Sequence, residues 1–136
     1  MQVNVSDREE DWEFNYRIPD FAVFLKGSKA KNCGTHWCGG PDFLSEILSP
    51  KDKAREKLPF YEELSVREVL LIDRGPWALE LYRLRNKKLR LVAKSTLKNP
   101  VWLESTVLPL RFRLVPGQGR PHIEIMHTDG TQRWLV

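Results

Sequence analysis

Three residues in the first half of the chain have the types and spacing needed to hold a metal ion beside a phosphate: Asp20, Glu46 and Lys57. Asp20 lies in the apolar run "IPDFAVF" (18–24), and Glu46 lies in "FLSEILSP" (43–50). Two carboxylates on neighbouring strands that point to one side are the minimum arrangement for Mg²⁺, a hard ion that takes oxygen ligands. Lys57 follows on the next predicted helix, where an ammonium could orient or deprotonate a water and stabilise charge on a phosphate.

Each acidic residue also has a simpler interpretation. Pro19-Asp20 reads equally well as the entry turn of a strand, with the carboxylate in water. Glu46 would then be a solvent-facing residue on a half-buried strand, since such strands alternate polar and apolar faces. The residues alone leave both interpretations open, although the sequence contains no GxSxG, HExxH or GxxxxGK[ST] motif that would indicate another catalytic site.

The elements that must position these residues follow from the hydrophobic pattern. We predict strands over residues 14–25, interrupted by Pro19, and over residues 41–48. A helix is predicted over residues 49–64, with Ser49 as N-cap and Pro50 in the first turn, and Pro59 should kink or split it near Lys57 to Leu58. The apolar run 67–73 is typical of a strand buried on both faces, so strand, helix and strand form a βαβ unit.

The second half of the chain predicts strands only. Residues 77–84 and 88–94 form a hairpin, further strands are expected at 107–115 and 121–127, and the Asp-Gly turn in "TDGT" leads into "QRWLV". The segment 26–40 is rich in Lys, Gly and small polar residues, so we expect an exposed loop. The predicted fold class is therefore α/β: one domain over residues 1–136, with a mixed sheet, one main crossover helix and C-terminal antiparallel strands.

Composition narrows the class of protein. The chain has 136 residues, of which 41% are hydrophobic and 29% charged, as in a globular domain. No apolar run approaches the roughly 20 residues of a membrane span, and no secretory signal is visible at the start, so a cytoplasmic location is the default expectation. The net charge of +4, with basic clusters at 26–31 and 83–94, permits an acidic partner without requiring one.

The cysteine loop "NCGTHWCGG" offers a rival site. Cys33, His36 and Cys38 are three soft ligands within six residues, which suggests a domain stabilised by zinc. A structural zinc needs four ligands, however, and neither His122 nor His127 stands in a recognisable pairing with this loop. Free thiols in a loop are the expected state, because a disulfide is disfavoured in a reducing compartment.

The order of motifs "YRIPDFAVF … GGPDFLSEILSP … EKLPFY … VREVLLIDR … LELYRL", from Tyr16 to Leu84, resembles the Uma2 family of the PD-(D/E)XK nuclease superfamily, a family assigned to the restriction endonucleases. The resemblance makes Asp20 and Glu46 the metal carboxylates, with the Ile47 backbone carbonyl as a further ligand. The superfamily's usual lysine position holds Leu48. A Lys-x-x-x-Tyr pattern on the following helix substitutes, and it falls on Lys57 and Tyr61.

The resemblance implies a magnesium-dependent DNA endonuclease, with Mn²⁺ as an alternative ion and Tyr61 supporting Lys57. Asp42, in the repeated Pro-Asp dipeptide, is a candidate outer residue of the site. Family members usually begin with an extra helical segment carrying an acidic residue, and this chain starts at about the strand that follows it. We therefore expect an uncovered sheet face or edge, which a second copy in a homodimer or another chain would cover. The alternative is an inactive nuclease fold used to bind DNA or protein.

Overall fold

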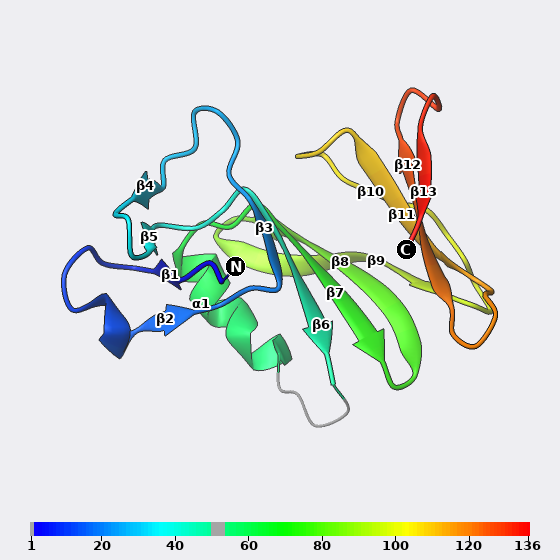
Figure 1. The fold of residues 1–136 in the computed structure, drawn as a ribbon, viewed down its shortest axis with the longest axis horizontal. Coiled ribbons are helices and arrows are strands. Elements are labelled where there is room, and N and C mark those ends of the chain that lie inside the picture. Colours follow the sequence, from blue (N-terminus) through cyan, green and yellow to red (C-terminus); the bar gives the residue numbers. More distant parts are fainter. Residues whose placement is uncertain (1, 50–53) are drawn as a thin grey trace.

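The computed structural model describes residues 2–49 and 54–136, and these residues form three β-sheets and a single α-helix (Figure 1). The central sheet has five strands in the order β3-β6-β7-β8-β9. Its members are β3 (Phe21–Val23), β6 (Phe43–Leu48), β7 (Glu68–Arg74), β8 (Trp77–Arg85) and β9 (Lys88–Thr96). Only β6 and β7 run parallel, and the other neighbours are antiparallel. The predicted mixed α/β class is confirmed.

The crossover between β6 and β7 carries the helix that the sequence predicts. It consists of the 3-10 helix η2 (Ala54–Lys57) followed directly by α1 (Leu58–Glu63). The change from 3-10 to α geometry falls between Lys57 and Leu58, where Pro59 was expected to split the helix. Pro50 lies outside the described residues, and Ser49 is not helical. The described helix therefore begins later than predicted.

The two faces of the central sheet have different covers. On one face, α1 packs Phe60 and Tyr61 against strand residues such as Leu44 and Leu71. On the other face lies a C-terminal antiparallel sheet in the order β10-β11-β12-β13 (Figure 1). Its strands are β10 (Leu103–Glu104), β11 (Leu110–Val115), β12 (His122–His127) and β13 (Arg133–Leu135). Residues of this sheet, including Phe112 and Leu114, form a second core with Leu70 and Leu79.

One buried carboxylate fastens the C-terminal region to the central sheet. Glu68, in β7, is 0% exposed and accepts hydrogen bonds from the Ser105 hydroxyl (2.5 Å) and the Thr106 amide (2.9 Å). Arg83 of β8 completes the cluster with its Nε 2.8 Å from Glu68. Since every buried polar group here has a partner, the cluster costs little to bury and holds the two sheets together.

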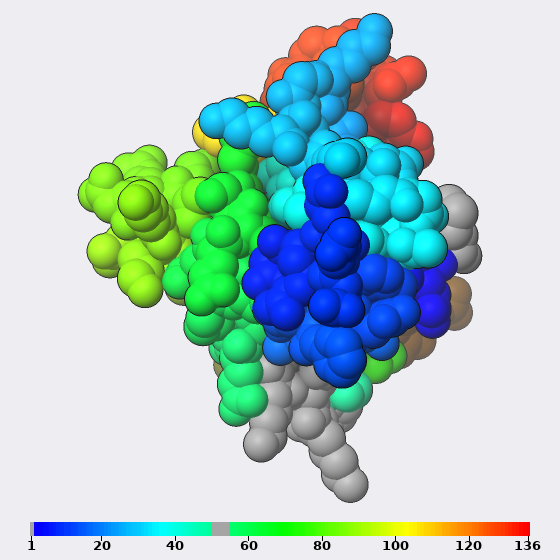
Figure 2. All heavy atoms as spheres, turned by 90° about the vertical axis from the view of Figure 1, so that its left-hand side faces the viewer, coloured from blue at the N-terminus to red at the C-terminus, as the bar shows by residue number. Residues whose placement is uncertain are grey.

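The N-terminal segments form a third, small sheet in the order β2-β1-β5-β4, with the 3-10 helix η1 (Trp12–Phe14) before β2. Its strands are β1 (Val5–Ser6), β2 (Tyr16–Arg17), β4 (Lys31–Asn32) and β5 (Trp37–Cys38). Figure 2 shows these blue and cyan segments gathered on one side of the molecule, with the yellow-green tip of the β8–β9 hairpin projecting beside them.

Two predictions about the N-terminal region need correction. The segment 26–40 is not a plain loop, because β4 and β5 pair within it and β5 also runs parallel to β1. The predicted strand 14–25 is two strands in different sheets, separated at Ile18 to Asp20, and Phe14 belongs to η1. Strands of two residues, such as β4 and β5, are too short to show hydrophobic alternation, which is why the pattern misses them.

No helix among the described residues is long and apolar enough to cross a membrane.

Candidate metal and catalytic site

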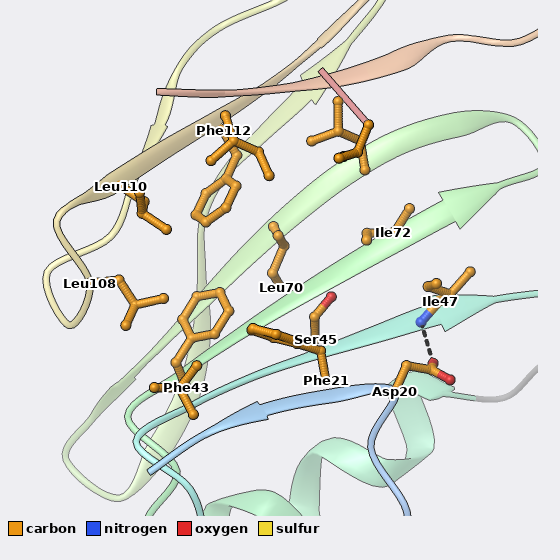
Figure 3. Close-up of a pocket in the computed structure, with 14 residues that line it drawn as sticks. Asp20, Phe21, Phe43, Ser45, Ile47, Leu70, Ile72, Leu108, Leu110 and Phe112 are labelled. Carbon is orange, nitrogen blue, oxygen red and sulfur yellow. Dashed lines mark hydrogen bonds between the residues drawn. The ribbon is translucent and has the colours of Figure 1, made fainter. Parts of the chain in front are cut away.

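The antiparallel pairing of β3 with β6 brings Asp20 beside the second half of β6. Phe21 pairs with Ser45, so Asp20, one residue earlier, comes level with Glu46. The Asp20 Oδ2 atom accepts a hydrogen bond of 2.7 Å from the backbone N–H of Ile47 (Figure 3). That amide lies beyond the last residue pair between β3 and β6, so the carboxylate takes the place of a strand partner. Asp20 therefore contacts β6 through its side chain, in addition to lying in the turn at Pro19-Asp20.

Glu46 lies on the face of the central sheet that α1 covers. It lies on the same face of β6 as the core residues Leu44 and Leu48, and it is only 3% exposed. The buried Tyr61 hydroxyl donates to Glu46 Oε1 at 2.5 Å, and Lys57 Nζ lies 3.6 Å from Oε2. Glu46 is therefore not solvent-facing, and the structure brings it together with Lys57 and Tyr61.

The electrostatics of Glu46 are unfavourable to its charge. Burial raises the pKa of Glu46 above its ordinary value of 4.5, and the neighbouring Asp20 carboxylate raises it further, while Tyr61 and Lys57 only partly offset the rise. Burial and the Glu46 carboxylate also raise the pKa of Tyr61 far above its usual range. Tyr61 therefore stays protonated and remains a hydrogen-bond donor to Glu46.

Asp20 and Glu46 are the described residues that could hold a divalent cation. The described hydrogen bonds occupy Asp20 Oδ2 and Glu46 Oε1, no described donor reaches Asp20 Oδ1, and Lys57 Nζ approaches Glu46 Oε2 to 3.6 Å. Within residues 2–49 and 54–136 no group of three or more His, Cys, Asp or Glu side chains is placed to hold a metal. Two carboxylates suffice for Mg²⁺, which is usually held by one or two of them and completes its shell with waters and substrate phosphate.

The family model that matches this chain is Uma2, described as "Putative restriction endonuclease", and the match spans residues 3–116. The chain belongs to the Uma2 family. Its mixed sheet with one crossover helix fits the restriction-endonuclease-like fold of this family. No curated protein matches the chain.

The resemblance names two further candidate residues, Ile47 and Asp42, and puts Leu48 at the superfamily's lysine position; the three lie in different places. Ile47 is adjacent to the site through its amide, and its side chain points away from Glu46 into a cavity of about 420 Å³ between the central and C-terminal sheets (Figure 3). Leu48 is a core residue under α1. Asp42 lies four residues before Glu46, about 13 Å along a strand, and accepts the Leu25 amide at 2.8 Å. The structure does not bring Asp42 to the carboxylate pair.

The cavity beside Ile47 lies on the face of the central sheet that is opposite α1. Its lining is almost entirely apolar and includes Phe21, Phe43 and Phe112. Phe21 is 56% exposed and Ile47 45% exposed, so this part of the face is only partly covered by the C-terminal sheet. That a second chain covers this exposed part stays a prediction.

The histidine of the cysteine loop, His36, has a structural role. His36 Nε2 lies 2.9 Å from the Arg8 carbonyl, Nδ1 lies 2.9 Å from the Thr35 hydroxyl, and the ring stacks on Trp12 at 4.8 Å. Both ring nitrogens therefore have partners within the fold. Cys33 and Cys38 are free thiols in this structure.

The basic cluster 83–94 covers the end of β8, the turn of the β8–β9 hairpin and most of β9. Part of its charge is neutralised within the molecule, because Arg83 pairs with Glu68 at 2.8 Å and Lys88 with Glu62 at 3.6 Å. Arg85 and Arg90 are exposed. The hairpin therefore offers less free positive charge than its sequence suggests.

One acidic residue close to the site, Glu80, was not predicted from the sequence. Glu80 in β8 is 5% exposed and lies on the same face as Glu46, because Leu71 of β7 pairs with both residues. Arg55 of η2 binds it with Nη2–Oε2 of 2.6 Å. A signal was available, since Glu80 interrupts the apolar stretch "WALELY", but only the strand register shows that it shares a row with Glu46.

Proposed function

We propose that this Uma2 protein hydrolyses phosphodiester bonds in DNA with the help of Mg²⁺. The observation that supports the proposal is the meeting of Asp20, Glu46 and Lys57 at one point of the central sheet: the Asp20 side chain binds the Ile47 amide, next to Glu46, and Lys57 lies 3.6 Å from Glu46. The family's description as restriction endonuclease supports a nuclease-type activity and DNA as the substrate.

The carboxylates of Asp20 and Glu46 would hold the ion, with the Ile47 carbonyl as a further ligand. Mn²⁺ is an alternative ion, because carboxylate and carbonyl oxygens suit both. When bound, the ion supplies charge stabilisation to a phosphoryl oxygen and lowers the pKa of a coordinated water. The unfavourable charge pair of Asp20 and Glu46 in the absence of a cation is the arrangement that such binding relieves.

The other residues act on water and phosphate. The Lys57 ammonium donates hydrogen bonds that orient the attacking water and stabilise the negative charge that develops on the phosphate. Hydrolysis forms a bond from the water oxygen to phosphorus, breaks the bond to the leaving oxygen, and transfers a proton to that oxygen. Tyr61 keeps Glu46 in place through its hydroxyl, so it supports Lys57 through the carboxylate that they share.

Glu46→Gln tests the proposal. The amide keeps the shape of the side chain but offers a neutral ligand to a hard dication, so Mg²⁺ binding should be lost and DNA cleavage should fall by about 100- to 1,000-fold. Glu56→Gln is the matched control, because Glu56 lies exposed on η2 next to Lys57 and should retain both properties. Calorimetric Mg²⁺ titration and plasmid nicking on the same preparations measure the two effects.

The outcomes separate the proposed enzyme from its alternative. Retained Mg²⁺-dependent cleavage by Glu46→Gln would sink the mechanism. DNA binding without cleavage by the unmodified protein, at any Mg²⁺ or Mn²⁺ concentration, would instead favour a nuclease fold that has become a binding domain.

A further inference from the structure

The short helix η2 carries two cations that meet two buried acids in one row of the central sheet. Arg55 pairs with Glu80, and Lys57, two residues later, pairs with Glu46. The two acids lie two strands apart, about 10 Å at the backbone, with Leu71 between them in register. Arg55 and Lys57 of this four-residue helix therefore both reach acids on the same face of the sheet.

The Arg55 contact is the more closely fixed of the two. Arg55 Nη2 lies 2.6 Å from Glu80 Oε2, Nε lies 3.3 Å from Oε1, and Nη2 also lies 3.4 Å from Asp73 Oδ2. Glu80 is fixed in turn by the Tyr82 hydroxyl at 2.8 Å. A planar guanidinium that binds a carboxylate through two nitrogens constrains both distance and orientation.

The Lys57 contact, by contrast, cannot fix its own geometry. It is a single approach of 3.6 Å by a flexible side chain that is 30% exposed. A four-residue 3-10 helix has little hydrogen bonding of its own to hold it in place. Among the described residues, the anchors of η2 that can set the place of Lys57 are α1 on its C-terminal side and Arg55 within it.

We propose that Arg55 is a positioning residue, whose ion pair with Glu80 holds η2 over β8 and thereby sets the place of the Lys57 ammonium relative to Glu46. The inference rests on the proposed function of Lys57. It assigns a role to Arg55 and Glu80 that does not involve contact with metal or substrate. A misplacement of about 1 Å in a catalytic group can cost about 100-fold in rate, so a loosened η2 should act on kcat.

Arg55→Gln tests the proposal, with Arg113→Gln as the matched control. Arg113 also pairs with a buried glutamate, Glu124, but on the C-terminal sheet. We expect Arg55→Gln to lower kcat by about 10- to 100-fold with KM changed less than about twofold. Arg113→Gln should leave both constants near those of the unmodified protein. Arg55→Lys should restore part of kcat, because it keeps a charge on Glu80 without the two-nitrogen contact.

A second measurement is independent of cleavage. Carbon-13 relaxation of the Lys57 side chain reports its order on the ps–ns timescale. The order parameter of its terminal methylene should fall in Arg55→Gln and stay unchanged in Arg113→Gln. If the unmodified protein cuts no DNA, the proposed function fails, while this measurement still decides whether Arg55 positions Lys57.

Other results of these experiments would overturn the proposal. Unchanged Lys57 order in Arg55→Gln would overturn the proposal, and so would an equal loss of kcat in both arginine variants, since that would indicate general destabilisation. Should Arg55→Gln not fold, Glu80→Gln removes the charge on the other partner and keeps the hydrogen-bonding shape. It should give the same loss of Lys57 order, and its failure to do so would also overturn the proposal.

Discussion

Glu46 and Glu80 are two buried glutamates on one face of one sheet, and their surroundings affect their charge in opposite directions. Burial acts to raise the pKa of both. At Glu46 burial prevails with the help of Asp20, and the pKa rises. At Glu80 the hydrogen bonds from Arg55 and Tyr82 outweigh burial, and the pKa falls below its ordinary value of 4.5. The charged form of Glu46 is therefore disfavoured, whereas the charged form of Glu80 is stabilised.

The difference lies in the partners. Glu80 has a two-nitrogen arginine contact of 2.6 Å and 3.3 Å, whereas Glu46 has a lysine at 3.6 Å and a like charge beside it. The proposed metal site keeps its charge unsatisfied, and the stability that this costs has to come from elsewhere in the fold. The paired Glu80 is one such source.

The largest expected effect is on stability at Glu80. Glu80→Ala leaves the Tyr82 hydroxyl without its partner and opens space in the sheet face, so we expect a loss of about 2 kcal/mol, a value kept low because Arg55 is half exposed. Urea unfolding at pH 7 measures it. Glu46→Gln in the same assay should be as stable as the unmodified protein or slightly more stable. A loss at Glu46 as large as that at Glu80 would contradict the comparison.

The pH dependence of these variants should differ in sign. Because the folded pKa of Glu46 is raised, its contribution to stability is complete below about pH 4.5 and is lost as the pH rises through the folded pKa. Glu46→Gln should therefore gain on the unmodified protein as the pH rises. Glu80 has a lowered pKa, so its contribution is present above about pH 4.5 and is lost on acidification. The deficit of Glu80→Gln should shrink at low pH. Unfolding from pH 3 to 8 compares the slopes.

A smaller effect is expected at Tyr61. Tyr61→Phe removes the donor to Glu46 Oε1 but keeps the ring in the core, so stability should fall by about 1 kcal/mol at pH 7. The loss should become smaller in acid, where Glu46 is protonated and burial of its charge no longer has to be offset. Tyr82→Phe, which removes a donor from the already paired Glu80, is the control. An equal loss for both variants would show that Glu46 does not depend specially on its tyrosine.

The smallest effect is expected far from both acids. Replacing Cys33 and Cys38 together by Ser should change the melting temperature by less than about 2 °C, because neither thiol is in a disulfide and both are partly exposed. Scanning calorimetry with a zinc assay checks this. A large loss of stability with stoichiometric zinc in the purified protein would revive the zinc-stabilised domain as the better interpretation.

The sequence predicts the central elements of this fold well and their three-dimensional relations less well. The strands around Glu46 and Glu80 and the break of the helix at Lys57 to Leu58 follow from long apolar patterns and from Pro59. The convergence of Asp20 with Glu46 was expected from the family resemblance. The Arg55–Glu80 contact was not expected, because it joins residues 25 positions apart. It also depends on the strand register that places Glu80 in its row, and composition and periodicity do not specify that register.

The pairing of β12 with β11 shows that the folding unit is longer than the family match. The match ends at residue 116, one residue after β11, yet β12 pairs with β11 over six residue pairs, and Ile123 and Ile125 pack against the second core. A chain cut at residue 116 would expose both an open strand edge and the apolar side chains beneath it, the combination that leads to aggregation. The end of the family match is therefore an unsuitable point at which to truncate this protein for expression.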